Sequence, residues 1–178
     1  MPQENKIHKI NDYIYLCESK IHNKGIFALK NISFGTKLLE YKGELISKKE
    51  GTKREDESIK LSKKNPSLGA TYIMEIDEEN DLDGNTENNY AKYINHSCEP
   101  NCEFEVERKT VWVYSTKNIK KDEEICCDYG FDFDEKNPFL HQCKCGSPSC
   151  VGYIVQEEQR EKFKEYLKKI TLEQKSKK

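Results

Sequence analysis

Three cysteines crowd the segment CKCGSPSC, at Cys143, Cys145 and Cys150. Gly146 and Pro148 favour turns, so the three thiols are expected to lie close together. Thiolates packed this closely repel one another unless a cation shares them, and a structural zinc ion takes four ligands. The alternative is three reduced cysteines in a polar loop. Spacing alone leaves as candidate fourth ligands the four histidines and five other cysteines, Cys17, Cys98, Cys102, Cys126 and Cys127.

The rest of the chain favours thiols and metal ligands over disulfides. The first residues carry no apolar segment typical of a secretory signal, and no run of about 18 apolar residues could span a membrane. We therefore expect an intracellular, reducing compartment, where disulfides rarely persist. The 178 residues predict one domain, and the net charge of -2 argues against a protein built mainly to coat nucleic acid.

Short apolar runs predict a mainly β fold with small helical additions. The segment 102–115 alternates as a hairpin does, and its candidate inward residues are Phe104, Val106, Val111 and Val113. After Gly152 the apolar period changes to 3.6, which predicts a C-terminal helix that docks on the domain through Phe163, Tyr166, Leu167 and Ile170. Other short apolar runs lie at residues 13–17, 26–29, 36–46 with a break at Gly43, 72–76 and 123–131.

Two polar stretches interrupt these runs. Residues 47–69 have almost no large apolar side chains, which predicts a solvated helix or loop inserted between core strands. Residues 75–85 are acidic, but aligning Gly84 with the glycine of a calcium-binding loop puts Tyr90 where a glutamate is required. We interpret residues 75–85 as a solvated acidic loop in preference to a patch that attracts a basic substrate.

The segment YINHSCEPNC, residues 93–102, combines His96, Ser97 and Cys98. A hydrolase is disfavoured because no nucleophile elbow accompanies His96, and Cys98 and His96 are too close in sequence to act as nucleophile and base. Five motifs do occur together and in order: NKGIFA, YKGE, YINHSCEPNC, EEICCDYG and CKCGSPSC. Together they resemble the SET-domain protein-lysine methyltransferases with a cysteine-rich post-SET motif.

The resemblance covers roughly residues 13–155 and implies a β-clip-like fold with a pseudoknot. In that fold the segment carrying NHSC is tucked under a loop formed by the segment carrying DYG. The implied organisation is a SET domain at 13–135 with the polar insert at 47–69, a zinc-binding post-SET segment at 139–155, and a C-terminal helix and tail at 156–178.

The resemblance also assigns site residues. Tyr129 matches the catalytic tyrosine, and Tyr72 matches a tyrosine that lines the channel for the target lysine. Cys98 matches the fourth zinc ligand, beside Cys143, Cys145 and Cys150. The residues implied to bind S-adenosylmethionine are Asn23, Lys24, Gly25, Tyr72, Asn95, His96 and Tyr129.

The chain departs from the family pattern at several positions. Glycine is frequent in the family where Asn23 stands, and Gly-Asn where Asn88 and Asn89 stand. Arginine is frequent where Lys92 and Val151 stand, and a cysteine-rich region before residue 13 is missing. Cys127 occupies the position, two before the catalytic tyrosine, that tunes methyl number in the family. Because cysteine is small, we expect room for more than one methyl group.

The chemistry explains why phenols suit such a site. A lysine amine with a pKa of about 10.4 is neutral in about one molecule in a few thousand at pH 7, a deficit of about 4.6 kcal/mol. A narrow apolar channel lowers that pKa by desolvating the ammonium, so positioning can replace a dedicated base.

The sequence thus predicts a methyltransferase acting on a lysine of a histone tail or another basic protein. The alternative is a catalytically weak, zinc-containing SET-like module that binds a protein. We further expect a monomer, no membrane partner, and a nucleosome contact through the lysine-rich end. The expected location is nuclear in a eukaryote, and otherwise cytoplasmic or secreted without a signal peptide.

Overall fold

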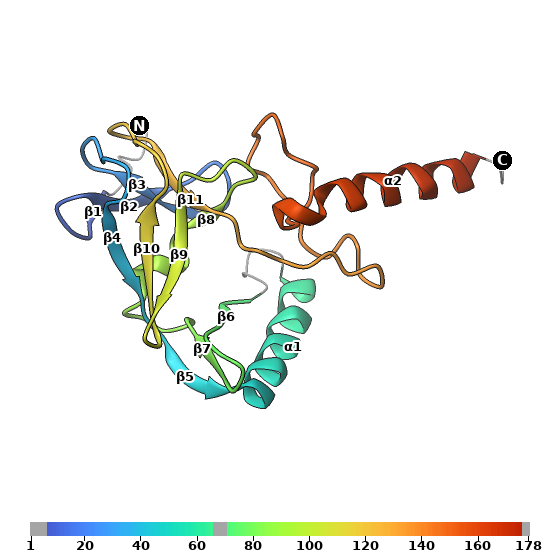
Figure 1. The fold of residues 1–178 in the computed structure, drawn as a ribbon, viewed down its shortest axis with the longest axis horizontal. Helices are drawn as coiled ribbons and strands as arrows, with labels where there is room; N and C mark the ends of the chain where they lie inside the picture. Colours follow the sequence, from blue (N-terminus) through green and yellow to red (C-terminus); the bar gives the residue numbers. More distant parts are fainter. Residues whose placement is uncertain (1–6, 66–70, 176–178) are drawn as a thin grey trace.

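The computed structural model describes residues 7–65 and 71–175. Residues 66–69 of the polar insert and 176–178 of the tail, about which the sequence made predictions, lie outside them. The described chain is mostly β with two α-helices and a curled sheet (Figure 1). None of the described helices combines the length and apolar character needed to cross a bilayer.

The larger sheet has eight strands, and seven follow the order β1-β2-β3-β11-β9-β10-β4 while β8 pairs with β11. Three other strands form a small sheet in the order β5-β7-β6. The strands of the larger sheet are β1 (His8–Lys9), β2 (Ile14–Glu18), β3 (Lys24–Ala28), β4 (Lys37–Tyr41), β8 (Asn95–His96), β9 (Cys102–Glu107), β10 (Thr110–Ser115) and β11 (Glu124–Cys127). The smaller sheet contains β5 (Glu44–Ser47), β6 (Ile73–Glu75) and β7 (Asn80–Asp83).

The crossing of the chain at β11 places the functional motifs. Cys127 pairs with His96 of β8 and with Cys102 of β9, both in parallel. A strand residue has one neighbour on each edge, so residues 97–101 must pass from one edge of β11 to the other. This crossing agrees with the knotted arrangement expected from the sequence, and it brings the NHSC and DYG segments side by side.

The hairpin of β9 and β10 shows how the core forms. Val111 and Val113 of β10 are fully buried, as predicted, and Phe104 packs partly against the core. The prediction for Val106 is wrong, because it is 47% exposed. Among the described residues, β9 pairs with β11 on its second edge only at Cys102, so no described strand lies beside Val106 on that edge.

The polar insert forms α1 (Lys48–Lys64), a helix that lies against the small sheet (Figure 1). Ser47 caps it by accepting a hydrogen bond from the Glu50 N–H. Lys48 and Arg54 bind Asp81 and Asp83 of β7 at 2.9 and 2.7 Å. The interpretation of residues 75–85 as a solvated loop is therefore wrong for β7, because these ion pairs let acidic side chains lie in a partly buried strand.

The C-terminal helix α2 (Arg160–Lys175) follows a single 3-10 turn, η2 (Glu157–Gln159), and projects away from the sheet (Figure 1). Phe163 is fully buried and packs edge-on against Phe133 and Tyr153, at ring distances of 5.2 and 5.5 Å. Tyr166, Leu167 and Ile170 are half-buried on the same face. The predicted helix and its docking face are confirmed.

Candidate active site and metal centre

Asn95 joins the first motif of the chain to the central crossing. Its Nδ2 lies 3.0 Å from the Lys24 carbonyl oxygen, 2.7 Å from the Glu124 carboxylate and 3.2 Å from Ser19 Oγ. A Cβ on Gly25 would come within 2.2 Å of the same Glu124 carboxylate. Glycine at this position therefore lets the loop at residues 23–25 lie directly on the Asn95–Glu124 pair.

The backbone of this loop also explains one departure from the family pattern. Asn23 has a φ of 38°, in the left-handed region. Glycine adopts this region without strain, and asparagine tolerates it better than most residues do. The replacement of glycine by Asn23 is thus compatible with the loop shape.

His96 is buried between the DYG segment and the cysteine cluster. The Tyr129 N–H donates to its Nδ1 at 3.2 Å, so the neutral ring carries its proton on Nε2, which lies 3.5 Å from Cys98 Sγ. Burial lowers the pKa of His96 to about 4, with Arg160 acting in the same direction and Asp128 opposing it. His96 is therefore neutral at physiological pH and connects Tyr129 to the cysteines.

Three tyrosines from distant parts of the chain form a phenol cluster, Tyr41, Tyr72 and Tyr129. The Tyr129 hydroxyl donates to the Ile94 carbonyl oxygen at 2.8 Å, and the Tyr41 hydroxyl donates to the Tyr72 carbonyl oxygen at 2.8 Å. Tyr129 is 36% exposed, but desolvation still raises the pKa of its phenol, and the neighbouring Cys127, Cys126, Tyr72 and Tyr41 raise it further. All of Tyr129's chemistry at neutral pH is therefore that of an un-ionised phenol.

Tyr41 and Glu124 are contact residues that the sequence did not single out. Tyr41 lies in the motif YKGE and Glu124 in EEICCDYG, so both were inside recognised motifs but without an assigned role. Only the fold shows that Tyr41 reaches Tyr72 and that Glu124 reaches Asn95.

The cysteine cluster unites Cys98 with the three cysteines of the C-terminal motif. Their four sulfur atoms all lie within 4.8 Å of one another, and Cys98 Sγ is 3.9 Å from Cys143 Sγ. Four sulfurs at 2.3 Å from a tetrahedral zinc would be about 3.8 Å apart, so the cluster fits zinc. Cys102, the main alternative from spacing, is buried in β9 and is not part of this group.

The thiols of the cluster differ in their ionisation. Burial raises the pKa of Cys98 to about 11, and neighbouring Cys145 and Cys150 add to the rise. Burial also opposes ionisation of Cys145, but hydrogen bonds from the Cys98 backbone and Ser147 outweigh it and lower the pKa of Cys145 to about 6. The Cys145 thiol is therefore favoured in the thiolate form that binds a cation, and a shared cation would favour ionisation of Cys98 as well.

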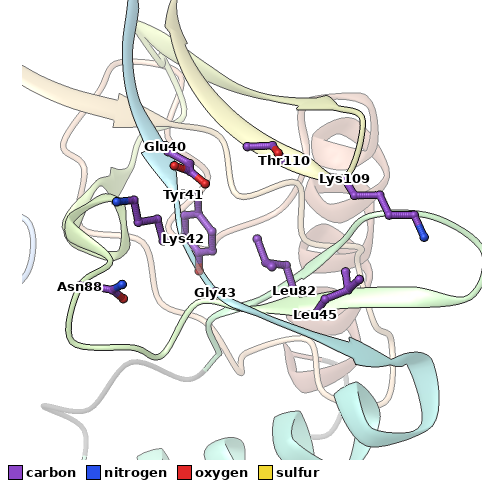
Figure 2. A pocket seen from close by; sticks show the side chains of 9 residues that line it. All are labelled: Glu40, Tyr41, Lys42, Gly43, Leu45, Leu82, Asn88, Lys109 and Thr110. Atoms are coloured by element: carbon purple, nitrogen blue, oxygen red, sulfur yellow. The ribbon is translucent and has the colours of Figure 1, made fainter.

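A surface pocket of about 350 Å³ lies between the β4–β5 connection and the tip of the β9–β10 hairpin (Figure 2). Leu45 and Leu82, which are cross-strand partners, lie beside each other in it. Its lining residues are Glu40, Tyr41, Lys42, Gly43, Leu45, Leu82, Asn88, Lys109 and Thr110. The pocket thus borders the phenol cluster at Tyr41 but includes none of the residues predicted to bind the cofactor or metal.

The sequence profile of the SET domain matches residues 23–130. The chain belongs to the SET-domain family. The match includes the loop at 23–25, the Asn95–His96 strand and Tyr129. It ends before the last three cysteines of the cluster.

Several fungal proteins resemble this SET domain, each named "Histone-lysine N-methyltransferase, H3 lysine-4 specific". One from Aspergillus oryzae is 32% identical over 154 residues, which cover 84% of this chain and 12% of the relative. One from Schizosaccharomyces pombe is 36% identical over 142 residues, covering 76% of this chain and 14% of the relative. One from Saccharomyces cerevisiae is 29% identical over 154 residues, which cover 84% of this chain and 14% of the relative. The chain thus spans only about an eighth of the length of these relatives.

Proposed function

We propose that this SET domain is an S-adenosylmethionine-dependent methyltransferase that modifies a lysine side chain of a histone or another basic protein. The observation that carries the proposal is the hydrogen bond from the Tyr129 N–H to His96 Nδ1 inside a SET domain. Through this bond the backbone of Tyr129, the proposed catalytic residue, lies next to His96 of the proposed cofactor-binding pair, Asn95 and His96. The names of the fungal relatives support histone H3 as the first substrate to test.

The residues around Asn95 fit the amino-acid end of S-adenosylmethionine. The Lys24 carbonyl, the Glu124 carboxylate and the oxygen of the Asn95 amide supply acceptors for the amino group of the cofactor. The loop at residues 23–25 lies within hydrogen-bond distance of Asn95 and offers mainly backbone groups. When bound, the cofactor supplies a methyl group made electrophilic by its sulfonium.

The phenol cluster orients the amine that receives this methyl group. Because the pKa of Tyr129 is raised, its hydroxyl stays protonated at neutral pH and does not act as a base. Tyr129 and Tyr72 instead provide apolar ring surface with one hydroxyl each, which favours a neutral, oriented lysine amine. Tyr41 helps to hold the Tyr72 backbone in place, because its hydroxyl donates a hydrogen bond to the Tyr72 carbonyl oxygen.

We assign Cys98, Cys143, Cys145 and Cys150 as the ligands of a structural zinc. The C-terminal segment also approaches the NHSC loop through Ser149, whose N–H donates to Glu99 at 3.1 Å. Zinc would fasten this segment over the crossing of β8 and β11. The same proposal divides the chain into a SET domain at 13–135, a post-SET segment at 139–155 and a C-terminal helix and tail at 156–178.

The finer assignments follow from the same activity. A histone substrate implies a nuclear location, and we propose that the chain acts as a monomer and contacts the nucleosome through its lysine-rich C-terminal end. Cys127, fully buried two residues before Tyr129, leaves space that would accommodate more than one methyl group.

The test is a radiolabelled methyl-transfer assay on core histones and cell lysate, with mass spectrometry of the labelled bands. We expect labelled lysine, and Tyr129→Phe should lower kcat by about 100-fold because the amine loses its orienting hydroxyl. Tyr114→Phe is the matched control, because Tyr114 hydrogen-bonds Glu107 on the distant hairpin. No transfer to any protein, together with no S-adenosylmethionine binding in isothermal titration, would instead support the catalytically weak binding module.

A further inference from the structure

One buried arginine ties the C-terminal helix to the site. Arg160, the first residue of α2, is only 6% exposed, and three of its nitrogens bind three different acceptors. Nε donates to the Val155 carbonyl oxygen at 3.1 Å, Nη1 to the Cys98 carbonyl oxygen at 2.8 Å, and Nη2 to Asp128 Oδ2 at 2.7 Å. A guanidinium presents five donors in a rigid plane, which lets one side chain bind these three separate acceptors together.

Asp128 passes the effect of this contact to Tyr129. Its Oδ2 receives Arg160, while its Oδ1 accepts the Gly130 N–H at 2.9 Å and lies 3.6 Å from His96 Nδ1. Tyr129 lies between Asp128 and Gly130 in the sequence, and its N–H donates to the same His96 nitrogen. The backbone that carries Tyr129 is therefore held on one side by His96 and on the other by the Gly130 hydrogen bond to Asp128, which Arg160 in turn binds.

Arg160 also contacts the segment that carries Cys98, one of the four cysteines of the cluster. The Cys98 carbonyl oxygen accepts Arg160 Nη1 at 2.8 Å and lies 3.4 Å from Ser149 Oγ of the C-terminal cysteine motif. A single side chain thus joins the NHSC loop, the DYG segment and α2. Arg160 lies outside residues 23–130, so it is not part of the SET-domain match.

We propose that Arg160 is a positioning residue for methyl transfer, holding Asp128 and the Cys98 loop so that Tyr129 faces the reacting amine. This inference rests on the proposed function. Docking of α2 is a separable property, because Phe163 packs against Phe133 and Tyr153 and does not depend on the guanidinium. Replacing Arg160 should therefore disturb Tyr129 while the helix stays docked.

The kinetic test compares Arg160→Met, Arg160→Lys and Asp128→Asn with Lys164→Met, which removes the same charge from an exposed position of α2. With saturating cofactor and histone peptide, Arg160→Met should lower kcat by about tenfold or more, because small displacements of reacting groups are costly. Arg160→Lys should lose less, since its ammonium can still reach one acceptor. The KM for peptide should change less than kcat, and Lys164→Met should match the wild type.

A double variant separates positioning from general loss of stability. Because Arg160 and Asp128 share one contact, the loss of kcat in Arg160→Met with Asp128→Asn should be smaller than the combined losses of the two single variants. Additive losses would overturn the proposal. Normal kcat in Arg160→Met, or a loss that only follows the unfolded fraction, would also overturn it. If Arg160→Met does not fold, Asp128→Asn breaks the same contact with α2 unchanged and decides the question.

Hydrogen–deuterium exchange of residues 128–131 in the zinc-loaded protein provides a readout that needs no activity. The Tyr129 and Gly130 amides should exchange about tenfold or more faster in Arg160→Met than in wild type or Lys164→Met. Unchanged exchange would refute the positioning role. A wild-type protein that methylates nothing would overturn the proposed function, while the exchange result would still decide whether Arg160 holds this segment.

Discussion

At the scale of single residues, Tyr41 shows how the phenol cluster depends on a glycine. Its hydroxyl binds the Tyr72 carbonyl oxygen, and its ring packs edge-on against Phe104 at 5.7 Å. A Cβ on Gly84 would lie 2.2 Å from the Tyr41 ring and hydroxyl. Gly84 is therefore needed for the closeness of the β7 segment to Tyr41, and not for a special backbone angle.

Gly84→Ala should displace Tyr41 and, with it, Tyr72. We expect kcat for methyl transfer to fall by about tenfold or more, because the channel loses its geometry. Steady-state kinetics on a histone peptide measures the effect. Asn85→Ala, which changes the exposed neighbour, is the control and should keep wild-type kcat. Unchanged kcat in Gly84→Ala would show that Tyr41 has no part in positioning.

The small side chain of Cys127 leads to a prediction about how many methyl groups the lysine receives. Cys127 is fully buried, and we expect so small a side chain to leave room for a methylated amine near Tyr129. Mass spectrometry should then detect dimethyl-lysine or trimethyl-lysine at long reaction times. Cys127→Tyr should shorten the series toward monomethyl-lysine, and overpacking should cost about 1–3 kcal/mol of stability. A wild-type series that stops at monomethyl-lysine would contradict the assignment.

The candidate residues inside the motifs could be named from the sequence, and the family resemblance supplied the grouping of the four cysteines, but the other contacts could not be predicted. Each motif named its own chemical groups, such as His96 and Tyr129. Tyr41, Glu124 and Arg160 gain their roles from contacts with residues far away in the sequence. Such contacts depend on the order of the strands in the sheet, and local sequence patterns do not predict that order.

At the scale of elements, the β6–β7 turn depends on one carboxylate. Asp77 accepts hydrogen bonds from the Glu79 and Asn80 backbone N–H groups at 3.0 and 2.8 Å and from the Asn80 amide at 2.8 Å. The Asn80 side chain first, and then the backbone of Glu79, lowers the pKa of Asp77 to about 2. The turn holds β6 next to β7, and β6 directly follows Tyr72.

The pH dependence of this turn has a definite sign. Because the folded pKa is below the ordinary value of 3.8, the ionised Asp77 stabilises the fold above pH 3.8. That stability should be lost as pH falls from 3.8 toward 2. Urea unfolding gives the free energy of unfolding of the wild type and of Asp77→Asn. The difference between the two should be constant near pH 6 and should shrink as the pH falls from 3.8 toward 2. Glu78→Gln, in the same turn, is the control, and an equal shrinkage there would refute the assignment.

Elements were predicted best where apolar residues alternate, as in β10 with Val111 and Val113. They were predicted worst where acidic residues find partners in another element. Residues 75–85 look solvated in sequence, yet Asp81 is buried because Lys48 of α1 neutralises it. The sequence predicted that α1 could be a solvated helix, but it did not predict that α1 contacts β7. The contact is made at Gly51, which is buried and where a Cβ would lie 2.1 Å from the Asp81 carboxylate.

At the scale of the whole molecule, the order of strands was beyond the reach of sequence patterns. The motif resemblance supplied the crossing of β8 and β11, because the family arrangement includes it. The placement of α2 followed from its 3.6 period, but its connection to the site through Arg160 did not. Apolar periodicity predicts which face is buried and is silent on which distant group a buried charge will bind.

Zinc removal tests how far the molecule depends on its cysteine cluster. The purified protein should carry one zinc per chain, and chelation should release the segment containing Cys143, Cys145 and Cys150. Structural zinc contributes several kcal/mol to folding, and a domain of this size changes its Tm by about 2–4 °C per kcal/mol, so Tm should fall by about 10 °C or more. Methyl transfer should fall with it, because Cys98 and His96 belong to one contact chain.

Paired cysteine variants separate loss of zinc from loss of any thiol. Cys143→Ser should lose zinc and show the lower Tm without a chelator, since three sulfurs no longer complete the tetrahedron. Cys17→Ser removes a thiol outside the cluster and should keep both zinc and Tm. Zinc content by mass spectrometry and Tm by calorimetry measure the two effects. A Cys143→Ser protein with a full zinc equivalent and unchanged Tm would mean that the four sulfurs are neighbours without a shared metal.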